Sequence, residues 1–158
     1  MTAFDAYLHA VVVRATQEAR EDGSATVDAH HLLLAIAAGP GSAARDALAS
    51  AGLDHTAVRE ALDREFEHSL NAVGVSATSY ALPKPSHSTP RPRMGASARL
   101  ALDRSFAATR KKDLRSTHLL LGILGARFGT VPRALALAGI DQDRLAAHAR
   151  QKLDGRSQ

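Results

Sequence analysis

The residues best suited to chemistry in this chain are its eight histidines, because the sequence contains no cysteine. His30 and His31 are adjacent at one predicted helix start, and His118 stands at a second. Neighbouring side chains on a helix project about 100° apart, so we expect that His30 and His31 cannot chelate one ion together. We predict structural roles for these histidines and no metal site.

Motifs that carry catalysis are absent from the sequence. It has no GxxxxGK[ST] phosphate-binding loop, no GxSxG or HExxH motif and no CxxC pair. Many of its serines lie in predicted loops, and no constellation of a serine, a histidine and an acid is evident. We therefore expect no enzymatic activity and no cofactor.

The composition favours a helical protein. Hydrophobic residues make up 45% of the chain and aromatic residues only 4%, and alanine and leucine dominate, as is typical of closely packed helices. The 158 residues suffice for one domain with a buried core. The absence of cysteine excludes a disulfide scaffold. The first residues have neither a basic start nor a long apolar run, so we expect a cytoplasmic protein with no export signal and no membrane contact.

One block of sequence occurs twice. HLLLAIAAGPGSAARDALASAGLD, residues 31–54, returns as HLLLGILGARFGTVPRALALAGID, residues 118–141. The offset of 87 continues through a further helix, and an earlier apolar stripe that begins at Phe4 returns from Met94. These patterns predict an all-α fold made of two four-helix repeats, 1–70 and 94–153, packed about a pseudo-two-fold axis into an eight-helix domain. Between them lies a proline-rich linker, 71–93, and after them a tail, 154–158.

Local signals place the helix ends. The glycines of the two AG[LI]D turns, Gly52 and Gly139, suit a left-handed residue that follows a helix. The aspartates after them are predicted to cap the fourth helix of each repeat. Asp28 or Ser116 is predicted to accept the free amides where the two LLL helices begin. These LLL helices are nearly all apolar, so we expect them at the centre of the fold.

Basic residues concentrate between residues 84 and 115. This stretch holds nine lysines and arginines against two aspartates. It is interpreted as a solvated helix face with a polar linker, or else as a docking surface for an acidic partner. Phe106 is the only aromatic residue within its basic run, so base stacking has little support and nucleic acid is an unfavoured partner. A regulatory or nucleic-acid-associated helical protein remains the alternative function.

The duplicated motifs resemble those of the Clp N-terminal domain family, in particular its ClpC and ClpA members. The resemblance rests on FDAYLHAVVVRATQEAR followed by VDAHHLLLAI, on STHLLLGIL and on the two AG[LI]D turns, and covers essentially residues 3–153. It implies a module that binds substrates or adaptor proteins and delivers them to an attached ATPase ring. The 158 residues contain no such ring. The chain therefore resembles freestanding members that act as an adaptor, a decoy or a scavenger, as a monomer or weak dimer, with a Clp ATPase, adaptor or substrate as partner.

The resemblance also singles out four candidate ligand-binding residues. Phe4 and Met94 match the seam between the repeats that receives hydrophobic ligands, including cyclic peptide antibiotics, although both side chains equally suit the core. His30 and Thr117 match two glutamates that, in ClpC-type members, bind the guanidinium side of phosphorylated arginine. The alternative interpretation of His30 and Thr117 is neutral change at exposed helix starts.

Phosphoarginine recognition is therefore predicted to be lost or redirected. A charge-assisted hydrogen bond contributes ~1.5–3 kcal/mol, so replacing both carboxylates weakens such a ligand by roughly two to four powers of ten. Calorimetry with a phosphoarginine peptide is expected to detect no micromolar binding. A micromolar dissociation constant would show this prediction to be wrong.

Overall fold

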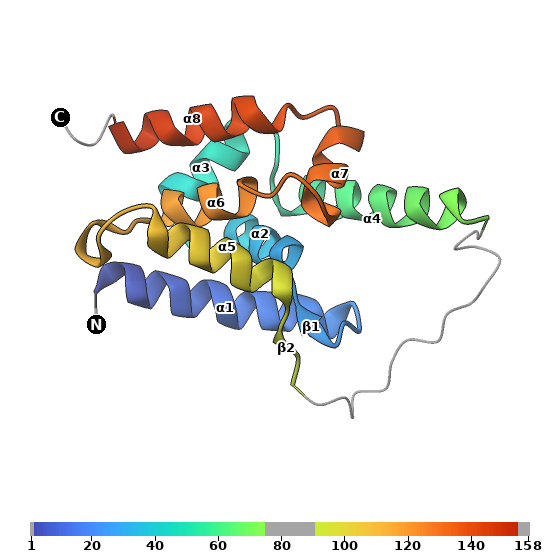
Figure 1. Cartoon of the computed structure of the whole chain (residues 1–158), viewed down its shortest axis with the longest axis horizontal. Coiled ribbons are helices and arrows are strands. Elements are labelled where there is room, and N and C mark those ends of the chain that lie inside the picture. The colour runs from blue at the N-terminus through green and yellow to red at the C-terminus, as the bar shows by residue number, and fades with distance from the viewer. Residues whose placement is uncertain (1, 75–90, 155–158) are drawn as a thin grey trace.

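The computed structural model describes residues 2–74 and 91–154. Within these residues the chain forms eight α-helices, which confirms the predicted all-α class (Figure 1). The first repeat contains α1 (Ala3–Glu21), α2 (Ala29–Ala38), α3 (Ala43–Ser50) and α4 (His55–Ala72). The second contains α5 (Ala96–Ala107), the 3-10 turn η1 (Lys111–Asp113), α6 (Ser116–Leu124), α7 (Thr130–Leu137) and α8 (Gln142–Asp154).

The predicted linker, 71–93, lies mostly outside the described residues, which leave out 75–90. Its two ends belong to regular structure, because α4 continues to Ala72 and Arg93 enters a short strand. No helix of the described residues combines the length and the apolar character needed to cross a bilayer.

The centre of the fold is the pair α2 and α6, as predicted (Figure 1). All leucines and isoleucines of both helices except the partly buried Leu121 are almost completely buried, and burying each such side chain contributes ~1.5–3 kcal/mol. The buried set is Leu32, Leu33, Leu34, Ile36, Leu119, Leu120, Ile123 and Leu124.

Around this centre, helices of each repeat pack against helices of the other repeat. Helix α3 of the first repeat packs on α8 of the second, and α7 of the second packs on α4 of the first. In the same way α1 contacts α6 while α5 contacts α2. Exchanging the four helices of one repeat for those of the other maps these contacts onto one another, which confirms the pseudo-two-fold packing. Each repeat therefore covers apolar surface of the other.

The turns before α4 and α8 also form as predicted. Gly52 and Gly139 have φ angles of +77° and +74°, and the amide of the residue after each glycine bonds back into the preceding helix. The Asp54 carboxylate accepts from the Ala57 amide at 2.8 Å, and the Asp141 carboxylate accepts from the Arg144 amide at 3.1 Å.

Two short strands that the sequence did not predict join the repeats at one edge. Strand β1 (Thr26–Val27) pairs in parallel with β2 (Arg93–Met94). The Gly95 amide then donates to the Val27 carbonyl at 2.8 Å. A Cβ atom at Gly95 would lie 2.1 Å from the Asp28 carboxylate, so any larger residue there must displace the Asp28 side chain. This edge fixes the start of α5 beside the start of α2.

A buried carboxylate fastens α4 to α1. The Glu18 side chain accepts from Arg59 at 2.5 Å and lies 2.7 Å from Nε2 of His55, both on α4. Burial alone would raise the pKa of Glu18. The hydrogen bonds from His55 and Arg14, together with the nearby positive charges, have the larger combined effect and hold the pKa below its usual value. The carboxylate therefore stays ionised and keeps both α4 partners at neutral pH.

Gly122 sets the distance between α5 and α6. A Cβ atom there would lie 2.2 Å from Oγ of Ser105 and 2.3 Å from the carbonyl oxygen of Ala101. We expect Gly122→Ala to lower the free energy of unfolding by ~1–3 kcal/mol because the two helices must separate. Urea denaturation measures this, with Gly41→Ala as the control because nothing lies within 4 Å of its added methyl. Equal stability of both variants would contradict the close packing.

Candidate functional site

The histidines at the starts of α2 and α6 act as helix caps. Nδ1 of His31 accepts from the Asp28 amide at 2.9 Å, and Nδ1 of His118 accepts from the Arg115 amide at 3.0 Å. A nitrogen that accepts from an amide carries no proton, so both imidazoles are neutral. The repeated histidine thus satisfies a free amide at each central helix, and its predicted structural role is confirmed.

Hydroxyl groups cap helices across the repeat boundary. Oγ of Ser97 on α5 accepts from the Ala29 amide of α2 at 2.9 Å, and Oγ of Ser116 on α6 accepts from the Ala44 amide of α3 at 3.2 Å. The prediction that Ser116 caps its own helix is wrong, because Ser116 is the first residue of α6 and its side chain reaches the other repeat. The starts of α2 and α6 are therefore held by contacts between the repeats.

Each of these starts opens onto a cavity. The α6 pocket, about 300 Å³, lies among the start of α6, the start of α1, the α2–α3 connection and the end of α8. The α2 pocket, about 290 Å³, lies among the start of α2, the start of α5 and the α6–α7 connection. Apart from the end of α8, which lines only the α6 pocket, each part of one pocket has its counterpart from the other repeat in the second pocket. Both repeats contribute to each pocket.

The α6 pocket combines unpartnered hydroxyls with positive charge. Thr117 is 1% exposed, and neither its Oγ1 nor the buried Tyr7 hydroxyl has a hydrogen-bond partner among the described residues. Burial raises the pKa of Tyr7, and this outweighs the opposing effect of nearby Ser42, so its hydroxyl keeps its proton. Arg115 and Lys152 line the same cavity and form no ion pair within residues 2–74 and 91–154.

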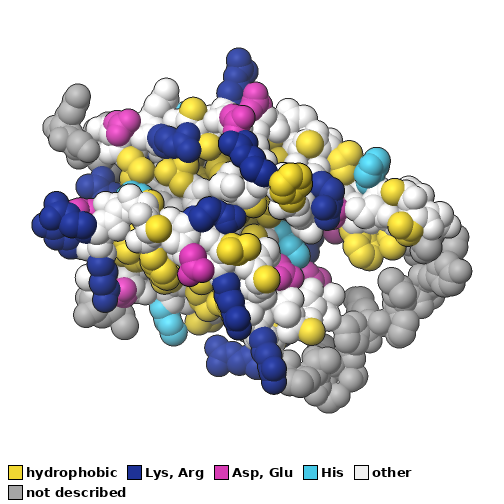
Figure 2. Space-filling model, viewed as in Figure 1, with side chains coloured by type: hydrophobic (Ala, Val, Ile, Leu, Met, Phe, Trp, Pro, Cys, Tyr) yellow, Lys and Arg dark blue, Asp and Glu magenta, His cyan; other side chains and the backbone are white. Residues whose placement is uncertain are grey.

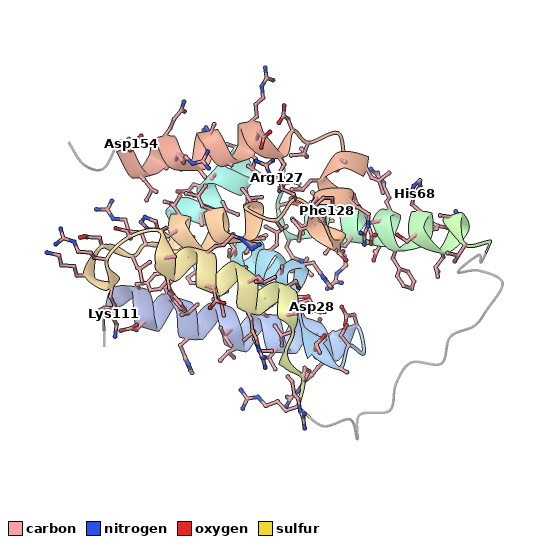
Figure 3. All side chains as sticks on the ribbon, in the orientation of Figure 1. Asp28, His68, Lys111, Arg127, Phe128 and Asp154 are labelled. Atoms are coloured by element: carbon pink, nitrogen blue, oxygen red, sulfur yellow. The ribbon has the colours of Figure 1, made fainter. Side chains whose placement is uncertain are left out.

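The α2 pocket has a different character. Asp28 lines it, but the Asp28 carboxylate already accepts from the hydroxyl of Thr26 at 2.9 Å. Arg133 also lines it and pairs with Glu65 at 2.9 Å. Phe128 is 92% exposed at its rim, in front of Val131 and Pro132. Figure 3 shows Asp28 and Phe128 well away from Lys111, which lies at the basic end of the molecule. This pocket is suited to an apolar side chain.

The four residues singled out by the resemblance fall into different places. Phe4 and Thr117 line the α6 pocket together, and His30 lines the α2 pocket. Met94 lines neither, because it belongs to β2 and packs partly buried against the core. The interpretation of Thr117 as an exposed helix start is wrong, since its side chain is buried. Neither His30 nor Thr117 supplies a carboxylate to its pocket.

Sequence reasoning missed Tyr7 and Lys152 as pocket residues. Tyr7 lies partly buried beside the start of α6, and Lys152 comes from the end of α8. Neither is near Thr117 in the sequence, so no local spacing indicates that they meet. Phe4 and Met94 are 90 positions apart, and the same offset relates Tyr7 to Ser97, which lies at the start of α2. This correspondence could have indicated that Tyr7 lies at the start of α6.

The argument from side-chain direction against a shared ion at His30 and His31 is wrong. Their ring centroids lie 4.0 Å apart, and their nitrogens and an Asp22 oxygen all lie within 4.8 Å of one another. Nevertheless, Nδ1 of His31 accepts from an amide, so its proton is on Nε2, which lies 2.7 Å from Asp22. An ion at Nε2 would displace this proton and disturb the cap of α2, so we assign no metal to the cluster.

The buried ring of His30 makes stability depend on pH. Burial, aided by His31, lowers the pKa of His30 from 6.5 to about 4. The unfolded state therefore binds more protons between these values, and the stabilisation is complete above pH ~6.5 and lost as the pH falls toward ~4. We expect His30 to account for a loss of ~3 kcal/mol in the free energy of unfolding over this range.

Urea denaturation between pH 7 and pH 4.5 measures this effect. His30→Gln is expected to show a flatter pH dependence than the unaltered chain, while His68→Gln, which changes an exposed residue of α4, keeps the original slope. Identical slopes for the unaltered chain and His30→Gln would contradict the assignment.

Comparison with known proteins agrees with this architecture. A family model described as the Clp repeat (R) N-terminal domain matches residues 3–107. No curated protein matches the sequence. The crystal structure of the N-terminal domain of the caseinolytic protease associated chaperone ClpD from Arabidopsis thaliana is similar, with a TM-score of 0.60 and 19% identity over 91% of this chain and 92% of that chain. This likeness shows the fold, and the family match covers about two thirds of the residues. The chain therefore belongs to the Clp repeat (R) N-terminal domain family, whose members are substrate- and adaptor-binding modules of Clp proteases.

Proposed function

We propose that this chain binds an unfolded substrate segment or an adaptor through the α6 pocket, and acts in a Clp protease system as an adaptor, decoy or scavenger. The observation that carries this proposal is the buried, unpartnered hydroxyl of Thr117 beside the cations of Arg115 and Lys152. A buried polar group without a partner costs ~1–3 kcal/mol. A ligand that supplies the missing hydrogen bond recovers that free energy.

The chemistry of the α6 pocket favours an oxygen-rich group. The protonated Tyr7 hydroxyl and the Thr117 hydroxyl can donate to a carboxylate or a peptide carbonyl, and Arg115 and Lys152 favour negative charge. Phe4, 7% exposed, supplies an apolar wall for the neighbouring part of the ligand. An acidic segment of an unfolded chain satisfies all of these groups.

The geometry gives less support to a cyclic peptide ligand at a seam between Phe4 and Met94. Neither the α6 pocket nor the α2 pocket is lined by both residues. Support for nucleic acid binding is also weak, because some of the basic residues are already engaged. Nε of Arg104 donates to the Gly122 carbonyl at 3.2 Å, and Arg110 lies 3.6 Å from Asp113.

Fluorescence anisotropy with fluorescein-labelled casein, an unfolded acidic protein, tests the pocket. Replacing both cations, Arg115→Gln with Lys152→Gln, is expected to weaken binding about three- to thirtyfold, as two solvent-accessible charges each contributing ~0.3–1 kcal/mol predict. The matched control is Arg144→Gln with Arg150→Gln, which removes the same charge from exposed positions of α8 outside the α6 pocket.

If both double variants bound casein equally weakly, the affinity would depend only on the net charge of the chain. That result would contradict a specific site in the α6 pocket. An adaptor is then distinguished from a decoy or scavenger by adding the chain to a Clp ATPase and protease that degrade casein. Faster degradation identifies an adaptor, and slower degradation identifies a decoy or scavenger.

A further inference from the structure

A third cavity lies between α4 and the connection from α1 to α2. We call it the α4 groove. It measures about 340 Å³, and its walls come from the end of α1, the start of α2, one face of α4 and the first residue of α7. Figure 2 shows a hollow beside α4 with histidine and acidic side chains on its wall. The groove is separate from the α6 pocket, with which it shares no residue.

The groove carries net negative charge. Of its charged residues, Arg59 pairs with Glu18, which it shares with Arg14, and Glu65 pairs with Arg133. Asp22 and Asp63 remain, and neither is paired with a lysine or arginine in the part of the chain that the structure describes. Asp22 receives hydrogen bonds from neutral His31 and from Ser24, which leaves its charge in place. Two carboxylates without a cation favour a positively charged ligand.

Apolar surface accompanies these carboxylates. Phe66 is 52% exposed on α4, one helical turn from Leu62, and both line the groove. A guanidinium group stacks well on an aromatic ring, and its methylene stem packs on aliphatic side chains. The planar guanidinium also matches carboxylate oxygens in pairs. Arginine therefore suits the groove better than a small cation does.

The α4 groove adjoins the α2 pocket. His30 and Thr130 line both cavities, and the ring of His30 lies against that of His31, with the centroids 4.0 Å apart. A ligand that extends from one cavity into the other passes these two residues. Beyond them, the ligand meets the exposed ring of Phe128.

We propose that the α4 groove binds an unmodified arginine side chain of a peptide, and that an adjacent apolar side chain of the same peptide occupies the α2 pocket against Phe128. The inference rests on the proposed peptide-binding function and adds a ligand class to it. The α6 pocket takes an acidic segment, and the opposite side of the molecule takes a segment in which arginine neighbours an apolar residue.

The test is an NMR titration of the full, ¹⁵N-labelled chain with the peptide acetyl-Gly-Arg-Leu-Gly-amide. Its partner peptide carries citrulline in place of arginine, which keeps the shape and removes the charge. The arginine peptide is expected to shift amide signals of α4 and of the α2 start, and to bind at least tenfold more tightly than the citrulline peptide. Equal affinities, or shifts confined to other regions, would overturn the proposal.

Variants on α4 identify the groups involved. Asp63→Asn is expected to weaken binding of the arginine peptide about two- to fivefold, and Phe66→Leu is expected to weaken it by a smaller factor. Glu67→Gln is the matched control, because it removes an exposed carboxylate of the same helix that does not line the groove. Unchanged affinity in Asp63→Asn would also overturn the proposal.

Casein binding separates this proposal from the function assigned to the α6 pocket. Asp63→Asn is expected to leave casein binding unchanged, and the double variant of Arg115 and Lys152 is expected to bind the arginine peptide normally. If the unaltered chain binds the arginine peptide but not casein, the function proposed for the α6 pocket is wrong. If it binds casein but not the arginine peptide, the ligand proposed for the α4 groove is wrong.

Discussion

The whole structure depends on burying two short, almost entirely apolar helices, α2 and α6. Each central helix packs mainly on helices of its own repeat, and the other repeat covers the surface that these leave: α5, α6 and α7 contact α2, while α1, α2 and α3 contact α6. Burial of apolar area is the main favourable term in folding, and here part of it becomes available only when both repeats are present. The duplication therefore completes the core.

The packing of helices across the repeat boundary also explains where the pockets are. A helix start needs partners for its free amides, and at α2 and α3 the hydroxyls of Ser97 and Ser116 come from the opposite repeat. Cavities therefore form where the repeats meet, in related places. The backbone frame is pseudo-symmetric, but the side chains differ: Thr117 with Tyr7 make one pocket a donor site, while His30 with exposed Phe128 make the other apolar.

Much of the fold could be predicted from local signals. Repeated leucines gave the central helices, and Gly52 and Gly139 gave the turns, because each depends on residues close in sequence. The β1–β2 edge escaped prediction because two-residue strands have no pattern and Thr26 meets Arg93 only in the folded chain. Tyr7 and Lys152 escaped for the same reason, and the contact between His30 and His31 escaped because side-chain rotamers can overcome their divergent directions. Phe4 and Met94 occupy different surroundings, because Phe4 lies on α1 and lines the α6 pocket while Met94 lies in strand β2.

The packing across the repeat boundary implies that both repeats unfold as one cooperative unit. Hydrogen exchange of the native chain in increasing, sub-denaturing urea tests it most directly, because it reports the opening free energy of each helix separately. The account predicts that slowly exchanging amides of α2 and α6 converge on one opening free energy, equal to that of global unfolding. If α6 opened at a clearly lower free energy while α2 stayed protected, the repeats would be independent and the composite pockets would lose their physical basis.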